Sequence, residues 1–352
     1  MKNKIYSKIK SNIFRPNWTT IETRDKKKLW LDKNENTDEN LSRYIKKIFK
    51  KLSISTFNSY PSLGKIYLNL AKFLKVSPKN IFISNGSDGA IKSVFETFIK
   101  KNDLIIRTDP TYAMYSIYSK IFSCKEKILH YDKNFKINIK LLLNYIRNSN
   151  PKLICIPNPD SPTGQVIESR TLEKIIKLTN KFKIFLLIDE AYFEYYKKTY
   201  IKKVNKYKNL IITRTAGKAY GISGARIGYA IADKSIIKAM HSTKPMYETN
   251  YIGVELFNQL ILKKNNIYIN KIVSEHIKAK KFFENSLKKK YEVLNTYGNF
   301  VLVNFGKDKK NILKRISMIC YYRHFDNGIL KGYTRFSLTN KKNFKKILKK
   351  IF

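Results

Sequence analysis

A lysine set among glycines is the part of the sequence that points most directly to chemistry. Lys218 lies in the stretch Thr215–Gly228, and four of the chain's 13 glycines fall between positions 217 and 228. Glycines allow tight turns and close backbone approach, and a lysine amine in a desolvated pocket can act as a nucleophile. The stretch therefore predicts a reactive amine in a glycine-rich loop. The alternative is an ordinary loop that carries two surface cations.

A carboxylate, a phenol and a helix start follow other apolar runs. Asp189 comes directly after the run 184–188, and Tyr192 lies three residues further on. A carboxylate at the end of an apolar strand is costly to bury unpaired, so it either meets a cation or lies in water at a cavity mouth. Gly86–Asp88 opens a predicted helix, whose free backbone N–H groups and dipole favour an anion. An ordinary helix cap is the alternative there.

Arginines and a proline-rich turn complete the candidate set. Residues 157–164 hold three prolines and a glycine, which predicts a rigid, non-helical path. Arginine makes up just 11 of the 71 basic residues, yet it stands at positions 226, 323 and 335. A guanidinium pairs with a carboxylate or phosphate better than an ammonium does, so these arginines are candidate anion ligands. For Arg335 the alternative is an exposed strand residue.

Short apolar strands alternate with helical patterns over the first two thirds of the chain. This alternation is typical of an α/β fold with a mostly parallel sheet covered on both faces. Ligands bind beyond the carboxyl ends of the strands in such sheets, so we expect the candidate residues to meet at one edge. The predicted strands cover 81–83, 104–106, 153–156, 185–188 and 210–212, and predicted helices cover 41–51, 62–75 and 170–182.

Beyond position 245 the pattern changes. A helical stretch over roughly 250–290 leads to alternating residues at 300–303, then to a strand at 334–338 and a terminal lysine-rich helix. These elements predict a second, smaller α+β domain. We expect the N-terminal segment, whose first 30 residues look like a polar, irregular arm, to return to that domain.

The composition narrows the classes of function. A formal net charge of +45 raises nucleic acid or an anionic surface as a partner. The lysines are nevertheless spread along the chain, so we expect solvated surface charge, weak salt-sensitive anion affinity and no specific nucleic-acid partner. The apolar runs are far shorter than the about 20 residues of a membrane span. Three scattered cysteines and four scattered histidines predict no disulfide framework and no metal site, and they fit a reducing cytoplasm.

The order and spacing of these motifs resemble those of fold-type I pyridoxal-phosphate aminotransferases, and most of all the histidinol-phosphate aminotransferase group. The resemblance runs from about position 30 to 345, nearly the whole chain. The matching motifs are Leu31–Asn36, Tyr60-Pro61, Gly86–Asp88, Pro110–Tyr115, Asn158–Gly164, Asp189–Tyr192, Thr215–Gly228, and Arg323 followed by Arg335.

The resemblance implies pyridoxal 5'-phosphate as the cofactor. Lys218 would hold it covalently and, once released, serve as general base, while Asp189 would hold the proton on the ring nitrogen. Tyr192 would hydrogen-bond the ring oxygen O3′. The other cofactor contacts would come from Ser161, in place of a family asparagine at O3′, from Tyr112 on the ring face, and, at the phosphate, from Gly86, Ser87, Asp88, Thr215, Arg226 and Tyr60 of the partner subunit.

The resemblance also implies a reaction and an assembly. Arg335, with Arg323 and Asn36, would bind the substrate. The expected reaction moves an amino group between glutamate or 2-oxoglutarate and a small phosphorylated or carboxylated compound such as histidinol phosphate, in amino-acid biosynthesis. The expected assembly is a homodimer with the active site at the subunit interface. Two alternatives stay open, a decarboxylase of a phosphorylated amino acid similar to threonine-phosphate decarboxylases, and a basic nucleic-acid-binding protein.

The expected domain division follows the same resemblance. It comprises an N-terminal arm with part of the small domain at 1–50, a large cofactor-binding domain at 51–245 and a C-terminal small domain at 246–352.

Overall fold

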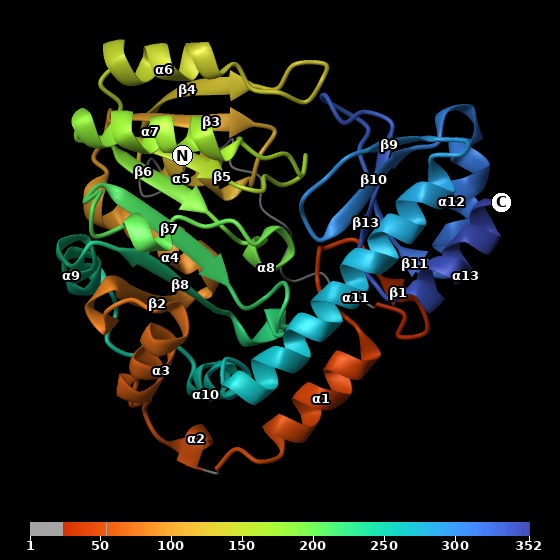
Figure 1. Ribbon diagram of the computed structural model, residues 1–352, viewed down its shortest axis with the longest axis horizontal. Helices are drawn as coiled ribbons and strands as arrows, with labels where there is room; N and C mark the ends of the chain where they lie inside the picture. Colours follow the sequence, from red (N-terminus) through yellow and green to blue (C-terminus); the bar gives the residue numbers. More distant parts are fainter. Residues whose placement is uncertain (1–23, 54) are drawn as a thin grey trace, which may run out of the picture.

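A large sheet forms the centre of the molecule (Figure 1). The computed structural model describes residues 24–53 and 55–352, so most of the predicted N-terminal arm lies outside the described residues. Within them, seven strands follow the order β2 (Ile81–Asn85), β8 (Ile227–Ala232), β7 (Leu210–Thr215), β6 (Phe185–Asp189), β5 (Leu153–Pro157), β3 (Leu104–Asp109) and β4 (Lys125–His130). β8 runs antiparallel to both of its neighbours, and the other pairings are parallel.

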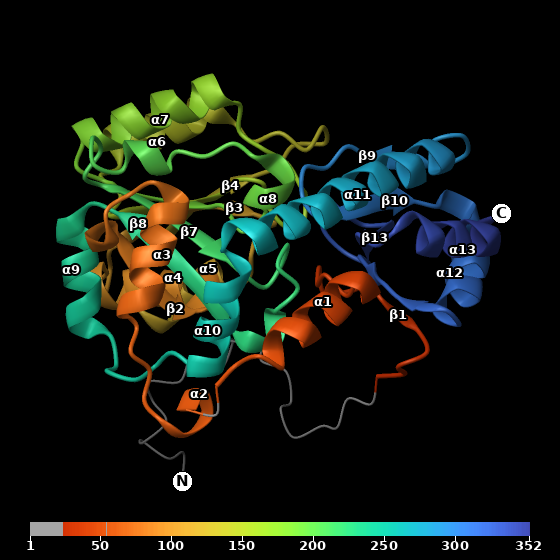
Figure 2. The ribbon, with the colours of Figure 1, turned by 60° about the horizontal axis from the view of Figure 1, so that its bottom comes forward.

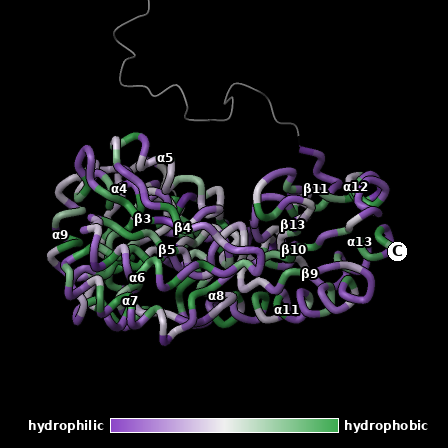
Figure 3. The backbone as a smooth tube through the Cα atoms, turned by 90° about the horizontal axis from the view of Figure 1, so that it is seen from above, coloured by the Kyte–Doolittle hydropathy of each residue, from purple (hydrophilic) through white to green (hydrophobic). Residues whose placement is uncertain are grey.

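Helices cover both faces of this sheet. They are α3 (Gly64–Leu74), α4 (Gly86–Phe98), α5 (Met114–Ile121), α6 (Ile139–Asn148), α7 (Ser169–Lys181), α9 (Lys234–Thr243) and α10 (Tyr251–Leu260). Successive strand residues point to opposite faces. Leu153 and Cys155 therefore pack with α4, α5 and α9, whereas Ile154 and Ile156 pack with α3, α6, α7 and α10. Figure 3 shows hydrophobic residues along these strands, so the α/β layering predicted from the sequence is confirmed.

A smaller antiparallel sheet lies beside the large one. Among the described residues its strands follow the order β12 (Arg323–His324), β13 (Tyr333–Ser337), β10 (Phe300–Asn304) and β9 (Glu292–Leu294). Three helices pack against it, α11 (Lys263–Leu287), α12 (Lys309–Ser317) and α13 (Lys341–Ile351). β1 (Leu29–Trp30) pairs in parallel with β11 (Cys320–Tyr321). The N-terminal segment thus returns to this region, as predicted.

The long helix α11 connects the two regions. Figures 1 and 2 show it running from α10, beside the large sheet, to β9 at the smaller sheet. α1 (Glu39–Phe49) lies next to α11, where the rings of Tyr44 and Tyr268 stack with centroids 4.2 Å apart. The stacking of Tyr44 on Tyr268 contributes to holding α1, which follows β1, against the helix that connects the two sheets.

Most predicted elements are present with shifted ends, and a few differ. The stretch predicted as helical over 250–290 is two helices, α10 and α11. The sequence pattern does not predict β4 or β8, because β4 is rich in charged residues and β8 follows directly on the glycine-rich stretch. Among the described residues, no helix is long and apolar enough to cross a membrane, and no group of three or more metal-ligating side chains is found.

Candidate active site

A cavity of about 290 Å³ lies beyond the carboxyl ends of β5, β6 and β7, the edge at which the sequence predicts a site. Residues from both sheets and from the turn after β1 converge on it. Most of its lining is polar or charged. The lining residues are Lys33, Asn34, Ser87, Asp88, Tyr112, Pro157, Pro159, Ser161, Asp189, Ala191, Tyr192, Thr215, Gly217, Lys218, Ser223, Arg226 and Arg335.

Asp189 ends β6 at this cavity and is only 5% exposed. Its carboxylate accepts hydrogen bonds from Tyr115 Oη, Thr213 Oγ1 and the backbone N–H of Ala191, each at 3.1 Å. Burial raises the pKa of Asp189 to about 6 in spite of these bonds. A carboxylate held in this way suits a ligand with a positively charged N–H, because that charge would restore the ionised form.

Lys218 and Tyr192 lie together at the cavity. Lys218 Nζ donates to the carbonyl of Lys33 at 3.3 Å and lies 5.9 Å from the centroid of the Tyr192 ring. Tyr192 Oη accepts a hydrogen bond from Asn34 Nδ2 at 3.0 Å. Because the hydroxyl is an acceptor in that contact, its own proton is available to an oxygen in the cavity.

Two glycines of the predicted loop are required by the local geometry. Gly221 has a φ of +67°, and a Cβ there would lie 2.7 Å from Leu41 Cδ2. At Gly228 a Cβ would lie 2.2 Å from both the backbone nitrogen of Ser87 and the carbonyl carbon of Gly86. Glycine at 228 therefore lets β8 approach the start of α4 closely. Close contacts at the site therefore require two of the four clustered glycines.

The start of α4 forms a candidate anion site. Ser87 and Asp88, in its first turn, line the cavity together with Thr215 and Arg226. The guanidinium of Arg226 reaches the same point, since a Cβ built on Gly86 would lie 2.7 Å from Arg226 Nη2. Backbone N–H groups at a helix start, a guanidinium and a hydroxyl together make a donor set suited to phosphate.

Tyr112 and Ser161 also line the cavity, and the segments that carry them both bond to the buried carboxylate of Asp160. Asp160 is 1% exposed and accepts hydrogen bonds from Thr111 Oγ1 at 2.8 Å and from the backbone N–H of Ser161 at 2.6 Å. Tyr131 Oη donates to the same carboxylate. Burial raises the pKa of Asp160 to about 7. The loops after β3 and β5 are therefore tied together where they meet the cavity.

Arg335 brings the smaller sheet to the cavity. Its Nη2 donates to the carbonyl of Asp32 at 2.8 Å, whereas its buried Nε has no hydrogen-bond partner in the described part of the chain. The guanidinium lies 5.5 Å from the ring centroid of Phe300 and 5.9 Å from that of Phe325. Burial lowers the pKa of Arg335, but an arginine stays charged in proteins. Such a partly unpaired cation suits an anionic ligand.

Four predicted site residues lie outside the cavity lining, namely Gly86, Asn36, Arg323 and Tyr60. Gly86 lies directly before Ser87, against the Arg226 guanidinium. Asn36 is buried and donates from Nδ2 to the carbonyl of Ala219 at 3.0 Å, so it braces the loop that bears the lysine. Arg323 is exposed on β12, directly across the ladder from Arg335.

Tyr60 lies at the surface rather than in the cavity lining. It is 75% exposed, and its ring stacks on that of Tyr247 with centroids 4.0 Å apart. Tyr247 precedes Glu248, whose carbonyl accepts a hydrogen bond from Asn85 Nδ2 at the start of α4. The loop that carries Tyr247 therefore packs near the candidate anion site, and Tyr60 stacks on it from the segment before α3.

Sequence reasoning missed two residues that shape the site, Asn34 and Asp160. Asn34 lines the cavity with a φ of +55°, a left-handed conformation that asparagine tolerates better than most residues. Its position inside the motif Leu31–Asn36 was the available signal. Asp160 gave a weaker signal, since a carboxylate in a proline-rich turn reads as ordinary turn chemistry.

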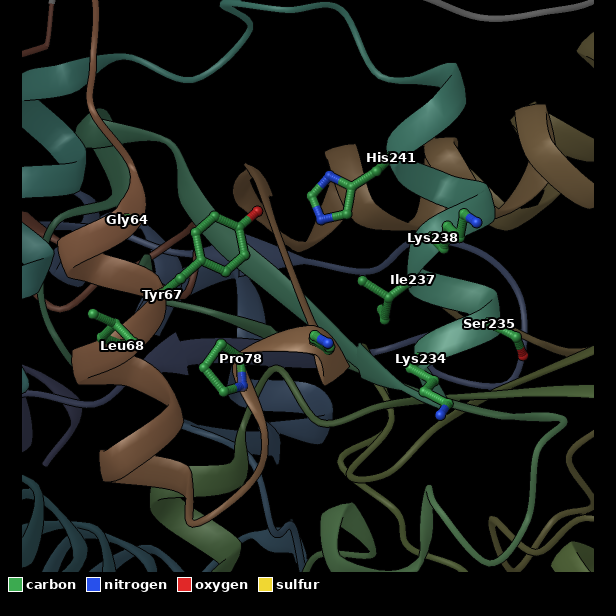
Figure 4. Close-up of a pocket in the computed structure, with 10 residues that line it drawn as sticks. Gly64, Tyr67, Leu68, Pro78, Lys234, Ser235, Ile237, Lys238 and His241 are labelled. Carbon is green, nitrogen blue, oxygen red and sulfur yellow. The ribbon is translucent and has the colours of Figure 1, made fainter.

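A larger and more open groove lies elsewhere, between α3, the 3-10 turn η2 (Pro78–Asn80) and α9 (Figure 4). Its volume is about 950 Å³, and its lining contains no carboxylate. The lining residues are Gly64, Tyr67, Leu68, Pro78, Lys79, Lys234, Ser235, Ile237, Lys238 and His241.

Side chains beside this groove close the outer edge of the large sheet. β2 is the edge strand. Tyr67 Oη accepts a hydrogen bond from the backbone N–H of Ile83 at 3.2 Å, and Lys244 Nζ donates to the carbonyl of the same residue. The backbone groups of Ile83 that face away from the sheet are thus satisfied within the chain.

The cavity residues fit pyridoxal phosphate. Asn34 Oδ1 and Arg335 Nε are buried at the cavity without a hydrogen-bond partner among the described residues. Buried polar groups are normally paired, so the cavity suits a polar ligand. The donors around Ser87 suit a phosphate, the buried carboxylate of Asp189 suits a protonated ring nitrogen, and the amine of Lys218 suits an aldehyde. Pyridoxal phosphate carries all three groups.

Comparison with known proteins assigns the family. The chain belongs to the aminotransferases of class I and II, whose family profile matches residues 26–351. The histidinol-phosphate aminotransferase of Caldanaerobacter subterraneus subsp. tengcongensis is 34% identical over 284 residues, which are 79% of this chain and 78% of that relative. The predicted family resemblance and enzyme class are confirmed, and the predicted pyridoxal-phosphate chemistry follows from this membership.

Solved structures show the same fold. The histidinol-phosphate aminotransferase of Sinorhizobium meliloti, in complex with pyridoxal 5'-phosphate, superposes with a TM-score of 0.78 at 19% identity, covering 92% of this chain and 89% of that one. The L-threonine-O-3-phosphate decarboxylase of Porphyromonas gingivalis superposes with a TM-score of 0.76 at 16% identity, covering 92% and 98%. The predicted fold-type I architecture is confirmed.

Proposed function

We propose that the protein transfers an amino group between glutamate or 2-oxoglutarate and histidinol phosphate or its oxo counterpart, with pyridoxal phosphate as cofactor. The observation that carries this proposal is the convergence of Lys218, Asp189 and Arg335 on one cavity. These residues supply an amine, a buried carboxylate and an anion-binding guanidinium. The substrate is taken from the printed name of the relatives, histidinol-phosphate aminotransferase.

Each residue has a definite task in this proposal. Pyridoxal phosphate, when bound, supplies the electron sink that makes the α-proton of an amino substrate removable. Lys218 Nζ would hold the cofactor and, when free, would remove and return that proton. Asp189 would keep the ring nitrogen protonated, and that positive charge would lower its raised pKa. Tyr192 Oη would donate to the ring oxygen, and Ser87 and Arg226 would hold the phosphate.

The anionic end of the substrate is assigned to Arg335. Its Nε is buried and has no hydrogen-bond partner among residues 24–53 and 55–352, and a charge-assisted bond from that atom to a phosphate or carboxylate would satisfy it. Arg323, opposite on β12, adds positive potential near the same point. Glutamate and histidinol phosphate both carry an anionic group, so one arginine serves both halves of the reaction.

The assembly and location are part of the proposal. We propose a homodimer in which Tyr60 of the partner subunit completes the cofactor phosphate site. The exposed stack of Tyr60 on Tyr247 supports this assignment. A cytoplasmic location and the domain division at 50 and 245 stay predictions from the sequence.

A half-reaction experiment tests the proposal. Purified protein loaded with pyridoxal phosphate is expected to be coloured, with an absorption band at visible wavelengths. Addition of glutamate should remove that band. Histidinol phosphate should have the same effect, and 2-oxoglutarate should then restore the colour. Protein that binds no pyridoxal phosphate, or that binds it but ignores both amino donors, would contradict the proposal.

A second candidate is decarboxylation of a phosphorylated amino acid. It is favoured by one observation, the likeness of the fold to L-threonine-O-3-phosphate decarboxylase. The two reactions need the same cofactor residues and differ in which substrate bond is broken. Release of carbon dioxide from phosphothreonine without any oxo acid would select this candidate over transamination.

A further inference from the structure

The Asn34 side chain contacts Tyr192, a residue assigned to the cofactor. Asn34 is 3% exposed, lines the cavity and has a φ of +55°. Its Nδ2 donates to Tyr192 Oη at 3.0 Å. A buried residue held in a left-handed conformation beside a site has a local energetic cost, which the surrounding structure must offset. In this conformation the Asn34 side chain reaches Tyr192.

The two residues before Asn34 contact the rest of the site. The carbonyl of Asp32 accepts a hydrogen bond from Arg335 Nη2 at 2.8 Å, and the carbonyl of Lys33 accepts one from Lys218 Nζ at 3.3 Å. Three consecutive residues therefore each contact a different member of the proposed machinery. The turn links the anion-binding arginine to the cofactor-binding lysine and tyrosine.

Backbone contacts hold Asn34 in place from the smaller sheet. Its N–H donates to Ser337 Oγ at 2.8 Å, and its carbonyl accepts from Asn299 Nδ2 at 2.9 Å. Arg24 forms an ion pair with the carboxylate of Asp32 at the start of the same turn. The backbone is thus fixed independently of the side-chain contact with Tyr192.

We propose that Asn34 is a positioning residue that sets the direction of the Tyr192 hydroxyl proton. A phenol has one proton and can donate just one hydrogen bond. Because Asn34 Nδ2 donates to Oη, the phenol proton points to another acceptor, which under the proposed function is the cofactor ring oxygen. Asn34 therefore acts through Tyr192, and this inference rests on the proposed function.

Two substitutions separate the side chain from the backbone. Asn34→Gly keeps the left-handed conformation and removes the donor, because glycine adopts positive φ freely. Asn34→Asp keeps the shape, but its carboxylate accepts the phenol proton and withdraws it from the cofactor. The matched control is Asn102→Gly, an asparagine with a φ of +69° that is exposed and lies outside the cavity lining.

The readouts are pyridoxal-phosphate affinity and the pH titration of the bound cofactor's absorbance. We expect Asn34→Gly to weaken cofactor binding by about 5–10-fold, the size of one hydrogen bond, and Asn34→Asp to weaken it at least as much. The pKa read from the absorbance should rise in both variants, because a donor to the ionised ring oxygen is lost. In a Tyr192→Phe background Asn34→Gly should add almost nothing.

The outcomes are distinguishable. If wild type binds pyridoxal phosphate and both Asn34 variants, shown to be folded by circular dichroism, match Asn102→Gly in affinity and titration, the inference is overturned. It is also overturned if Asn34→Gly has its full effect in the Tyr192→Phe background. A wild type that binds no pyridoxal phosphate would instead overturn the proposed function.

Discussion

The cavity at the strand ends is smaller than the groove beside α9, yet its lining contains the more varied set of chemical groups. The groove has about three times the volume, about 950 against 290 Å³. Its basic groups are three lysines and one histidine, and the described lining has no acidic partner for them. The smaller cavity gathers two lysines, two carboxylates and two arginines from different segments. Catalytic capacity here follows the convergence of unlike groups, not volume.

The two regions also differ in how their cations are held. Lys218, Arg226 and Arg335 lie at strand ends or on a strand, where the backbone fixes them. Lys234 and Lys238 project from one side of α9 near the surface. A cation with a fixed position can select an anion by geometry, whereas a mobile surface lysine contributes mainly to the general field.

The largest expected difference between the regions is at the lysines. Lys218→Ala is expected to lower the rate of the glutamate half-reaction by about 10³-fold, because the general base is lost. Lys234→Ala, which removes a groove cation, should leave the rate within about twofold. Single-turnover absorbance measurements on both variants give the comparison. Equal effects would mean that the cavity is not the active site.

The next difference concerns the arginine. Arg335→Gln is expected to raise KM for the anionic substrate by about 10²-fold, since loss of one member of a buried charge pair costs about 2–5 kcal/mol. Lys238→Gln removes the same charge from the groove and should change KM little. Steady-state kinetics at two salt concentrations checks this. A similar rise in both variants would point to the general charge of the surface.

The third difference is a pH dependence of stability that arises from a buried carboxylate, a group that the described lining of the groove does not contain. Asp189 has a raised pKa, so without cofactor the folded state holds a proton there that the unfolded state releases between about pH 4 and 6. Its contribution to stability is therefore lost as pH rises through that window. Asp189→Asn should become more stable relative to wild type between pH 4 and 6, by up to about 3 kcal/mol. Urea unfolding of cofactor-free protein measures this.

The Asp189 prediction has a clear control. Glu96 is an exposed carboxylate on α4. Glu96→Gln removes a carboxylate that is paired with Lys92 at the surface, so it is the matched comparison for removing the buried carboxylate of Asp189. If the free energy of unfolding depends on pH in the same way in both variants, burial does not raise the pKa of Asp189.

The smallest effect is expected in the groove itself. Leu68 is 63% exposed on α3, so Leu68→Ser should change the free energy of unfolding by less than about 0.5 kcal/mol. Turnover should be unchanged. Thermal unfolding and the half-reaction assay check both statements. A loss of turnover would show that the groove communicates with the cavity.

The sequence predicts the fold and much of the site because strand ends are easy to read. Asp189 ends an apolar run and Lys218 follows one, and parallel topology then brings them together. Arg226 directly precedes β8, whose antiparallel direction places it at the same edge. Arg335 was predicted from a different signal, because arginine is scarce in this lysine-rich chain. These signals are local in the sequence, so they can be recognised without knowledge of tertiary packing.

The missed features depend on contacts that are distant in sequence. Asn34 contacts Tyr192 across 158 positions, and Asp160 accepts from Thr111 and Tyr131, which follow β3 and β4. Asn36, predicted to bind the substrate, donates to the carbonyl of Ala219. A motif indicates that a segment approaches the site, but packing decides which of its side chains faces the cavity.

The side-chain closure of β2 limits how copies of this protein can associate. An open edge strand offers backbone donors and acceptors to a strand of another molecule. With Tyr67 and Lys244 already bonded to Ile83, that edge is a poor template at this point for extending the sheet into a neighbour. Growth into continuous β-structure is therefore disfavoured at this point of the edge, and the proposed dimer would use other surfaces, such as the one around Tyr60.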